Sequence, residues 1–198
     1  MTFLFCVMAY LLGSLSSAVI VCRLAGLPDP RTTGSKNPGA TNVLRVGGKR
    51  LAALTLLGDV LKGVIAVQLA MVYSSEPNLV GPVILAVFLG HLYPIFFDFQ
   101  GGKGVATALG ALFILSPAVG SLFVVTWLIM MAFLQISSLA ALTAAFLTPF
   151  YVFWLKGADF SLYIACMSAI LFWRHRVNIK RLIRGEELKI SIFSKIRS

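Results

Sequence analysis

The stretch of this chain best suited to chemistry is GHLYPIFFDFQGGKGVAT, which runs from Gly90 to Thr107. It ends in three closely spaced glycines around Lys103, and glycines let backbone N–H groups approach an anion. A helix that begins after Gly104 would also direct its positive end at that anion. One hypothesis is a phosphate-binding turn at a membrane surface, but not a Walker A loop, because Gly104 follows Lys103 where that motif needs Ser or Thr. The alternative is a glycine-rich turn whose lysine marks the cytoplasmic edge of a membrane.

Three further segments carry polar side chains suited to an anion. They are GSKNPGATNVLRVGGKR from Gly34, the turn at 135–138, and RHRVNIKRLIRGEELK from Arg174. Their candidates, with those of the glycine-rich turn, are Ser35, Asn37, Asn42, Arg45, Gly101, Gly102, Lys103, Gly104, Ser137, Ser138, His175 and Asn178. Because donors outnumber carboxylates, this set suits a doubly anionic phosphate ligand. We expect no metal site, since no pair of histidines has ligand spacing and carboxylates are scarce.

The composition indicates that these segments lie at a membrane. The chain is 59% hydrophobic, has a mean hydropathy of +0.91 and carries a formal net charge of +10. A soluble domain is about half apolar at most, so we expect one transmembrane domain over residues 1–198. Basic residues cluster in two places, six between Arg23 and Arg50 and eight between Arg174 and Arg197. Such clusters mark the cytoplasmic side of a membrane and attract anionic lipid or anionic substrates. We expect no nucleic acid partner.

The apolar segments predict an all-α integral membrane protein, a polytopic bundle of about seven transmembrane helices. Five of them are Phe3–Cys22, Leu51–Tyr73, Leu79–Phe97, Leu139–Leu155 and Phe160–Trp173. The 31 residues from Gly104 to Leu134 are too many for one span and too few for two full ones. Because both basic clusters belong in the cytoplasm, we favour two crossings there, the first a short helix of about 13 residues. The N-terminus is then periplasmic and the C-terminus cytoplasmic. The alternative is five spans with a re-entrant segment.

The second span contains two ionisable residues, Asp59 and Lys62. They lie three residues apart and therefore share a helix face. Ionisable groups inside a membrane are costly and are usually paired, so a structural ion pair is the commoner arrangement. A catalytic role, or a Lys62 that reaches an anionic site, is the alternative.

Two polar segments beside the spans also need a structural interpretation. We expect the long segment from Arg23 to Arg50 to form an ordered loop at the interface, with a flexible basic loop as the alternative. After Trp173, apolar residues at 177, 179, 182 and 183 predict an interfacial helix. We expect Lys189, Lys195 and Arg197 to belong to a solvated basic tail.

Three motifs in order, GSKNPGATNVLR, GHLYPIFFDFQGGKGVAT and RHRVNIKRLIRGEELK, resemble the cytoplasmic motifs of the PlsY family. These are bacterial acyl-phosphate:glycerol-3-phosphate acyltransferases. The likeness covers nearly the whole chain, including its length, its pattern of spans and the Ser137-Ser138 turn. It implies a multi-pass protein of the bacterial inner membrane whose active site faces the cytoplasm.

The resemblance also implies an activity and roles for residues. The family transfers a fatty acyl group from acyl phosphate to the sn-1 hydroxyl of glycerol 3-phosphate, giving lysophosphatidate and inorganic phosphate in the first step of phospholipid synthesis. The resemblance implies an enzyme without a cofactor that acts as a monomer. It is also compatible with a contact with the enzyme that forms acyl phosphate. By motif, the residues linked to activity are Ser35, Arg45, His175 and Asn178. The phosphate-binding loop is Gly101, Gly102, Lys103, Gly104, Val105, Ala106 and Thr107, and Glu187 matches a structural glutamate.

These expectations combine into one mechanism. Arg45, Lys103 and His175 with Asn178 bind glycerol 3-phosphate, while the loop amides bind acyl phosphate. Either His175 or a phosphate oxygen of the substrate acts as the base. Two other classes of function are the alternatives, namely a transporter of small phosphorylated metabolites and a lipid-binding scaffold. The transporter is disfavoured because the polar residues gather at one face instead of the membrane midplane.

Overall fold

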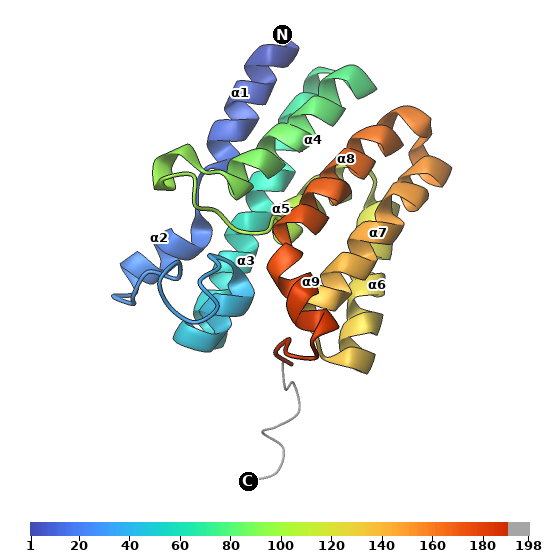
Figure 1. The fold of residues 1–198 in the computed structure, drawn as a ribbon. Helices are drawn as coiled ribbons and strands as arrows, with labels where there is room; N and C mark the ends of the chain where they lie inside the picture. Colours follow the sequence, from blue (N-terminus) through green and yellow to red (C-terminus); the bar gives the residue numbers. More distant parts are fainter. Residues whose placement is uncertain (190–198) are drawn as a thin grey trace. The chain divides into compact units, whose positions relative to one another are not determined.

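The structure is a computed structural model that describes residues 1–189, so the predictions for Lys195 and Arg197 lie outside the described residues. Throughout the described part, the regular elements are helices (Figure 1). In order they are α1 (Thr2–Gly13), α2 (Ser17–Leu24), α3 (Ala40–Tyr73), α4 (Pro77–Leu92), the 3-10 helix η1 (Ile95–Phe97), α5 (Val105–Leu115), α6 (Pro117–Leu134), α7 (Ser137–Lys156), α8 (Ala158–Arg174) and α9 (Arg176–Ile183).

The helices confirm an all-α integral membrane protein. Five helical segments among the described residues are long and apolar enough to span a membrane, and α5 is a shorter apolar helix. The 31-residue segment divides as predicted, because Ser116 is extended and ends α5 after 11 residues, and Pro117 then begins the 18-residue α6. The last predicted span corresponds to α8, with 17 residues. The side of the membrane on which each terminus lies stays a prediction.

Two helices differ in detail from the predicted spans. The first span is interrupted between α1 and α2, where Lys62 Nζ donates a hydrogen bond to the carbonyl of Leu15 at 2.9 Å. The second begins at Ala40 instead of Leu51 and bends at Gly48, whose φ is +80°. A glycine takes this positive-φ conformation without strain, which lets the helix bend there and continue to Tyr73. The expected basic loop is therefore ordered, and its second half is helical.

Glycines allow the first helices to lie in close contact. A Cβ on Gly63 of α3 would meet the carbonyl of Thr107 in α5, and one on Gly110 of α5 would meet the carbonyl of Val60 in α3. A Cβ on Gly13 of α1 would likewise meet the carbonyl of Val87 in α4. Small residues that let helix backbones approach are the usual packing device within membranes. The glycines of these spans therefore serve helix packing.

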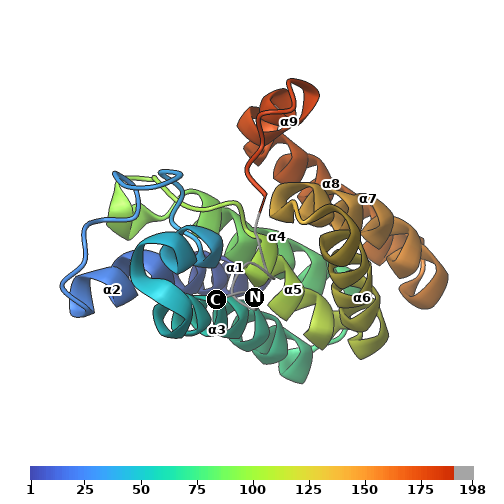
Figure 2. The same cartoon turned by 90° about the horizontal axis from the view of Figure 1, so that it is seen from below.

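The described chain forms two compact units, the first spanning Met1–Gly120 and the second beginning at Ser121. In the first unit, α4 lies beside α1 and α3, and α3 also lies beside α5 (Figure 1, Figure 2). In the second unit α7 lies against α8, and Ser168 donates a hydrogen bond to the carbonyl of Ala145 between them at 2.8 Å. A single domain over the whole chain stays a prediction.

Candidate functional site

The loop before α3 is organised by one buried side chain, that of Asn42, which is 1% exposed. Its Oδ1 accepts a hydrogen bond from the backbone N–H of Ser35 at 2.8 Å. Its Nδ2 donates to the carbonyls of Pro30 and Thr33 at 2.9 and 3.0 Å. These bonds fix the backbone around Ser35, a residue that is itself exposed. Asn42 therefore shapes this loop, and its predicted contact with substrate stays a prediction.

The glycine-rich turn leads directly into α5, as the sequence predicted. Gly104 has φ +84° and is the N-cap of α5, which begins at Val105. The first N–H groups of a helix have no carbonyl partner within that helix, and the helix dipole makes this end positive. The amides of Val105, Ala106 and Thr107 thus lie at the end of α5 that suits a phosphate. The buried Thr107 also fixes α5, because its carbonyl lies against Gly63 of α3.

Each glycine of the turn lies where a side chain would collide with its surroundings. A Cβ on Gly101 would meet the carbonyls of His91 and Leu92. A Cβ on Gly102 would meet His91 Nε2 and would lie 2.9 Å from the carbonyl of Pro38. The turn is therefore enclosed by the end of α4 on one side and by the loop of Ser35 on the other. Two of the predicted motifs are thus brought together in the first unit.

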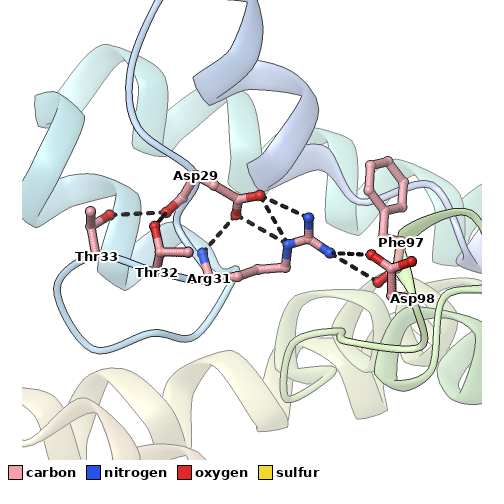
Figure 3. Close-up of polar contacts among 6 residues, drawn as sticks. All are labelled: Asp29, Arg31, Thr32, Thr33, Phe97 and Asp98. Carbon is pink, nitrogen blue, oxygen red and sulfur yellow. Dashed lines mark hydrogen bonds and ion pairs between the residues drawn. The ribbon is translucent and has the colours of Figure 1, made fainter.

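An arginine that the sequence analysis did not single out also joins these motifs. Arg31 Nη1 donates to the carbonyl of Phe97 at 3.0 Å and lies 3.5 Å from Asp98 Oδ2 (Figure 3). Its Nε and Nη2 donate to the two carboxylate oxygens of Asp29, at 3.1 and 2.8 Å. Hydrogen bonding to Arg31 holds the pKa of Asp29 below its ordinary value, and the same bonds raise the pKa of Arg31. Asp29 and Arg31 are two residues apart, so their ion pair is compatible with the sequence alone. No sequence signal identifies the Phe97 carbonyl as a partner of Arg31.

Arg45 and Lys103 are the two basic residues of the first unit that are predicted to bind the phosphate ligand. Arg45 is exposed on α3, one turn after Asn42, and Lys103 is half-buried in the glycine-rich turn. Asn37 is half-buried in the loop next to Pro38, where its carbonyl accepts the N–H of Gly39 at 2.9 Å. All three lie on the segments that converge at Gly102, and their contacts with a ligand stay predictions.

The second unit gathers another set of predicted residues around Glu187. Its Oε1 accepts hydrogen bonds from Ser138 Oγ at 2.7 Å and from Asn178 Nδ2 at 2.5 Å. Ser138 and Asn178 are 8% and 9% exposed, and they come from α7 and α9. The glutamate therefore connects two helices, which agrees with a structural role. Ser137, its neighbour on α7, is half-buried.

His175 lies at the junction of α8 and α9 and is 2% exposed. Its Nδ1 lies 2.9 Å from the carbonyl of Leu171. A carbonyl can only accept, so in the neutral imidazole Nδ1 carries the proton and Nε2 carries the lone pair. This tautomer can accept a proton or a hydrogen bond at Nε2, which suits either role predicted for His175.

The predicted ion pair within the second span is present and has a third member. Lys62 Nζ and Asp59 Oδ1 are 3.1 Å apart, and His91 Nδ1 lies 3.5 Å from the same oxygen. All three side chains are buried. The sequence does not identify His91 as this third member, because a histidine on a different helix has no spacing that links it to Asp59.

Comparisons with known proteins agree with the motifs. A sequence model of the family described as glycerol-3-phosphate acyltransferase matches residues 3–185. The glycerol-3-phosphate acyltransferase of Thioalkalivibrio sulfidiphilus is 55% identical over 193 residues, covering 96% of this chain and 94% of the relative. That of Methylococcus capsulatus is 55% identical over 183 residues, covering 92% of each chain.

Solved structures show the same fold. A crystal structure of PlsY, described as an integral membrane glycerol 3-phosphate acyltransferase in its glycerol 3-phosphate form, matches with a TM-score of 0.91. Its sequence is 37% identical, and the match covers 96% of both chains. The lysophosphatidic acid form matches with a TM-score of 0.89 and 36% identity, covering 96% of this chain and 95% of the other.

Proposed function

Because the chain belongs to the glycerol-3-phosphate acyltransferase family of integral membrane enzymes, we propose that it transfers a fatty acyl group from acyl phosphate to the sn-1 hydroxyl of glycerol 3-phosphate. The products are lysophosphatidate and inorganic phosphate. The similar PlsY structures are described in glycerol 3-phosphate and lysophosphatidic acid forms, which are this acceptor and this product. The reaction takes place at the cytoplasmic face of the bacterial inner membrane, and the enzyme acts as a monomer.

The observation that carries the proposal is the glycine-rich turn at the N-terminus of α5. Gly104 places the first amides of α5 beside Lys103, and Gly102 joins this turn to the loop of Ser35. A positive helix end with a neighbouring lysine is a strong environment for a phosphoryl group. We assign the loop amides to acyl phosphate, and Arg45, Lys103, His175 and Asn178 to glycerol 3-phosphate.

For this reaction the protein mainly has to align the two substrates and stabilise the negative charge that develops. The sn-1 oxygen attacks the acyl carbon, the bond from this carbon to the phosphate oxygen breaks, and phosphate leaves with the electron pair. Acyl phosphate is a mixed anhydride, so the leaving group is already good. Holding the two reactants together and stabilising the negative charge that develops then supplies much of the rate enhancement.

The hydroxyl proton has two acceptors in this mechanism. One is Nε2 of His175, because Nδ1 faces the Leu171 carbonyl. The other is an oxygen of the phosphate that leaves, and no protein base is then needed. His175→Ala distinguishes them: a raised KM for glycerol 3-phosphate with kcat retained at saturation supports the phosphate, and a lowered kcat with an unchanged KM supports His175.

The proposed function is tested with purified protein in detergent and labelled glycerol 3-phosphate, given either palmitoyl phosphate or palmitoyl-CoA. We expect labelled lysophosphatidate from palmitoyl phosphate alone. Lys103→Ala should abolish most of this activity, whereas Lys49→Ala, at an exposed lysine of α3, should retain it. Product from palmitoyl-CoA alone would contradict the proposed donor. No product from folded protein would favour a transporter of phosphorylated metabolites, for which uptake into vesicles is the assay.

A further inference from the structure

The first unit contains a buried polar cluster that the proposed mechanism does not use. Asp59 and Lys62 of α3 and His91 of α4 are 2%, 4% and 7% exposed. Asp59 Oδ1 lies 3.1 Å from Lys62 Nζ and 3.5 Å from His91 Nδ1. Ionisable groups inside a membrane protein are costly, and they commonly mark a functional requirement. The simplest role, stabilisation of α3 by an ion pair, does not require His91.

One end of this cluster is fixed to the first span. Lys62 Nζ donates to the carbonyl of Leu15 at 2.9 Å, where the chain is interrupted between α1 and α2. The ammonium is therefore held by a carbonyl and a carboxylate, and the carboxylate in turn faces the imidazole. With a carbonyl and a carboxylate as partners, the Lys62 side chain has little rotamer freedom left.

The other end of the cluster lies against the glycine-rich turn. A Cβ on Gly102 would meet His91 Nε2, so the imidazole edge lies directly behind the Gly102 backbone. The backbone N–H of Gly102 donates to the carbonyl of His91 at 3.2 Å. A Cβ on Gly101 would meet that same carbonyl. His91 therefore contacts the turn through both its ring and its backbone.

We propose that His91 is a positioning residue for the glycine-rich turn, and that Asp59, itself paired with Lys62, orients the His91 ring. The proposal rests on the proposed function, in which this turn binds acyl phosphate. With Asp59 Oδ1 facing Nδ1 at 3.5 Å, the opposite edge of the ring, Nε2, faces the turn, and Nε2 then limits how far the Gly102 backbone can move toward α4. The turn keeps its amides in the orientation that the phosphate needs, and His91 itself does not touch the substrate.

The test replaces His91 and leaves the ion pair intact. His91→Phe replaces the imidazole by a slightly larger planar ring without nitrogens, while Asp59 retains Lys62. We expect the KM for palmitoyl phosphate to rise between about 10- and 100-fold, since small misplacements of binding groups have effects of this size. The KM for glycerol 3-phosphate should rise clearly less, because only Lys103 of its assigned residues lies on this turn, whereas Arg45, His175 and Asn178 lie on other segments. His91→Gln, which restores a polar group, should recover part of the affinity.

A matched control comes from the same helix. Thr55 of α3 is fully buried, lies one turn before Asp59, and donates its hydroxyl to the carbonyl of Leu51 at 2.9 Å. Thr55→Val should leave both KM values unchanged. Equal increases in both KM values for His91→Phe, together with lowered thermal stability, would overturn the proposal in favour of a general structural role. An unchanged KM for palmitoyl phosphate in a stable variant would overturn it as well.

Hydrogen exchange provides a readout that does not depend on the proposed activity. We expect faster exchange in His91→Phe at the amides of residues 101–107, with unchanged exchange in α3. If wild-type protein makes no product from palmitoyl phosphate, the proposed function fails, and this exchange still shows whether His91 orders the turn. Unchanged exchange at these amides would overturn the positioning role even if the activity is confirmed.

Discussion

Arg31 donates a hydrogen bond at 3.0 Å to the backbone carbonyl of Phe97, a residue 66 positions further along the chain (Figure 3). The guanidinium is held at its other edge by the carboxylate of Asp29. One planar side chain thus connects the loop that carries Ser35 to the segment that precedes the glycine-rich turn. Arginine suits this position because its donors form a rigid fork, whereas lysine presents a single point charge.

Arg31→Lys should therefore weaken the connection without changing the net charge. A lysine cannot bond both carboxylate oxygens of Asp29 and the Phe97 carbonyl in the same geometry. Charge-assisted hydrogen bonds contribute about 1.5–3 kcal/mol, and partial exposure lowers this, so we expect a loss of kcat/KM of about 3- to 30-fold. Steady-state kinetics with both substrates measures it, and Arg50→Lys, at an exposed site on α3, is the control. Wild-type kinetics in Arg31→Lys would show that the connection does not matter for activity.

The same pair predicts how stability depends on pH. Hydrogen bonds from Arg31 lower the pKa of Asp29 below its ordinary value of 3.8. A carboxyl whose pKa is lowered by folding stabilises the protein above its unfolded pKa, and this stabilisation is lost as the pH falls through the folded pKa. Asp29→Asn should thus lower the thermal unfolding temperature by a constant amount between about pH 6 and 8. The difference from wild type should shrink below about pH 4, and a difference that grows in acid would contradict this account.

Much of the candidate site could be predicted because its signals are local. Glycines around Lys103 predicted a turn with a helix after it, and α5 begins at Val105. Ser116-Pro117 predicted that the segment from Gly104 to Leu134, too long for one span and too short for two full ones, divides into a short and a long helix, as observed. Asp59 and Lys62 are paired because their spacing puts them on one helix face. In each case the residues that carry the signal are neighbours along the chain or along one helix.

The contacts that join distant segments could not be predicted in this way. Arg31 bonds a backbone carbonyl of Phe97, and a carbonyl has the same chemistry at every residue. His91 meets Asp59 only because α3 and α4 lie side by side. The interruption after α1 was also missed, because its apolar sequence is compatible with one continuous span and a lysine from α3 supplies the partner at Leu15. Such features depend on tertiary packing, which overrides local preference.

Gly104 offers a test of the glycine-rich turn with a matched control. It has φ +84°, and a Cβ there would meet the ring of Phe88. Gly26 has φ +66° with nothing within 4 Å of an added Cβ. Both alanine variants carry the left-handed strain of about 1–2 kcal/mol, but only Gly104→Ala also displaces the turn. We expect Gly104→Ala to lose most acyltransferase activity and Gly26→Ala to retain it. Equal activities would mean that the turn tolerates the displacement.

The hydrogen bonds at Glu187 allow the effect of Asn178 on protein stability to be measured separately from its effect on activity. Asn178 Nδ2 donates to Glu187 Oε1, which also accepts from Ser138. Asn178→Asp places two carboxylates against each other, so it should lower the thermal unfolding temperature more than Asn178→Ala does. Glu187→Gln in the same chain supplies an amide that donates to the carboxylate introduced at position 178, so the double variant should recover much of the lost stability.

Activity should not return with that stability, because Asn178 is assigned to glycerol 3-phosphate and an aspartate there repels the substrate phosphate. Thermal unfolding in detergent and acyltransferase kinetics measure the two effects separately, on wild type, on the single variants Asn178→Asp, Asn178→Ala and Glu187→Gln, and on the double variant. Glu186→Gln is the control, since Glu186 is an exposed neighbour that loses the same charge. If the double variant regains activity together with stability, Asn178 acts only by holding α9 through Glu187, and its assignment to the substrate is wrong.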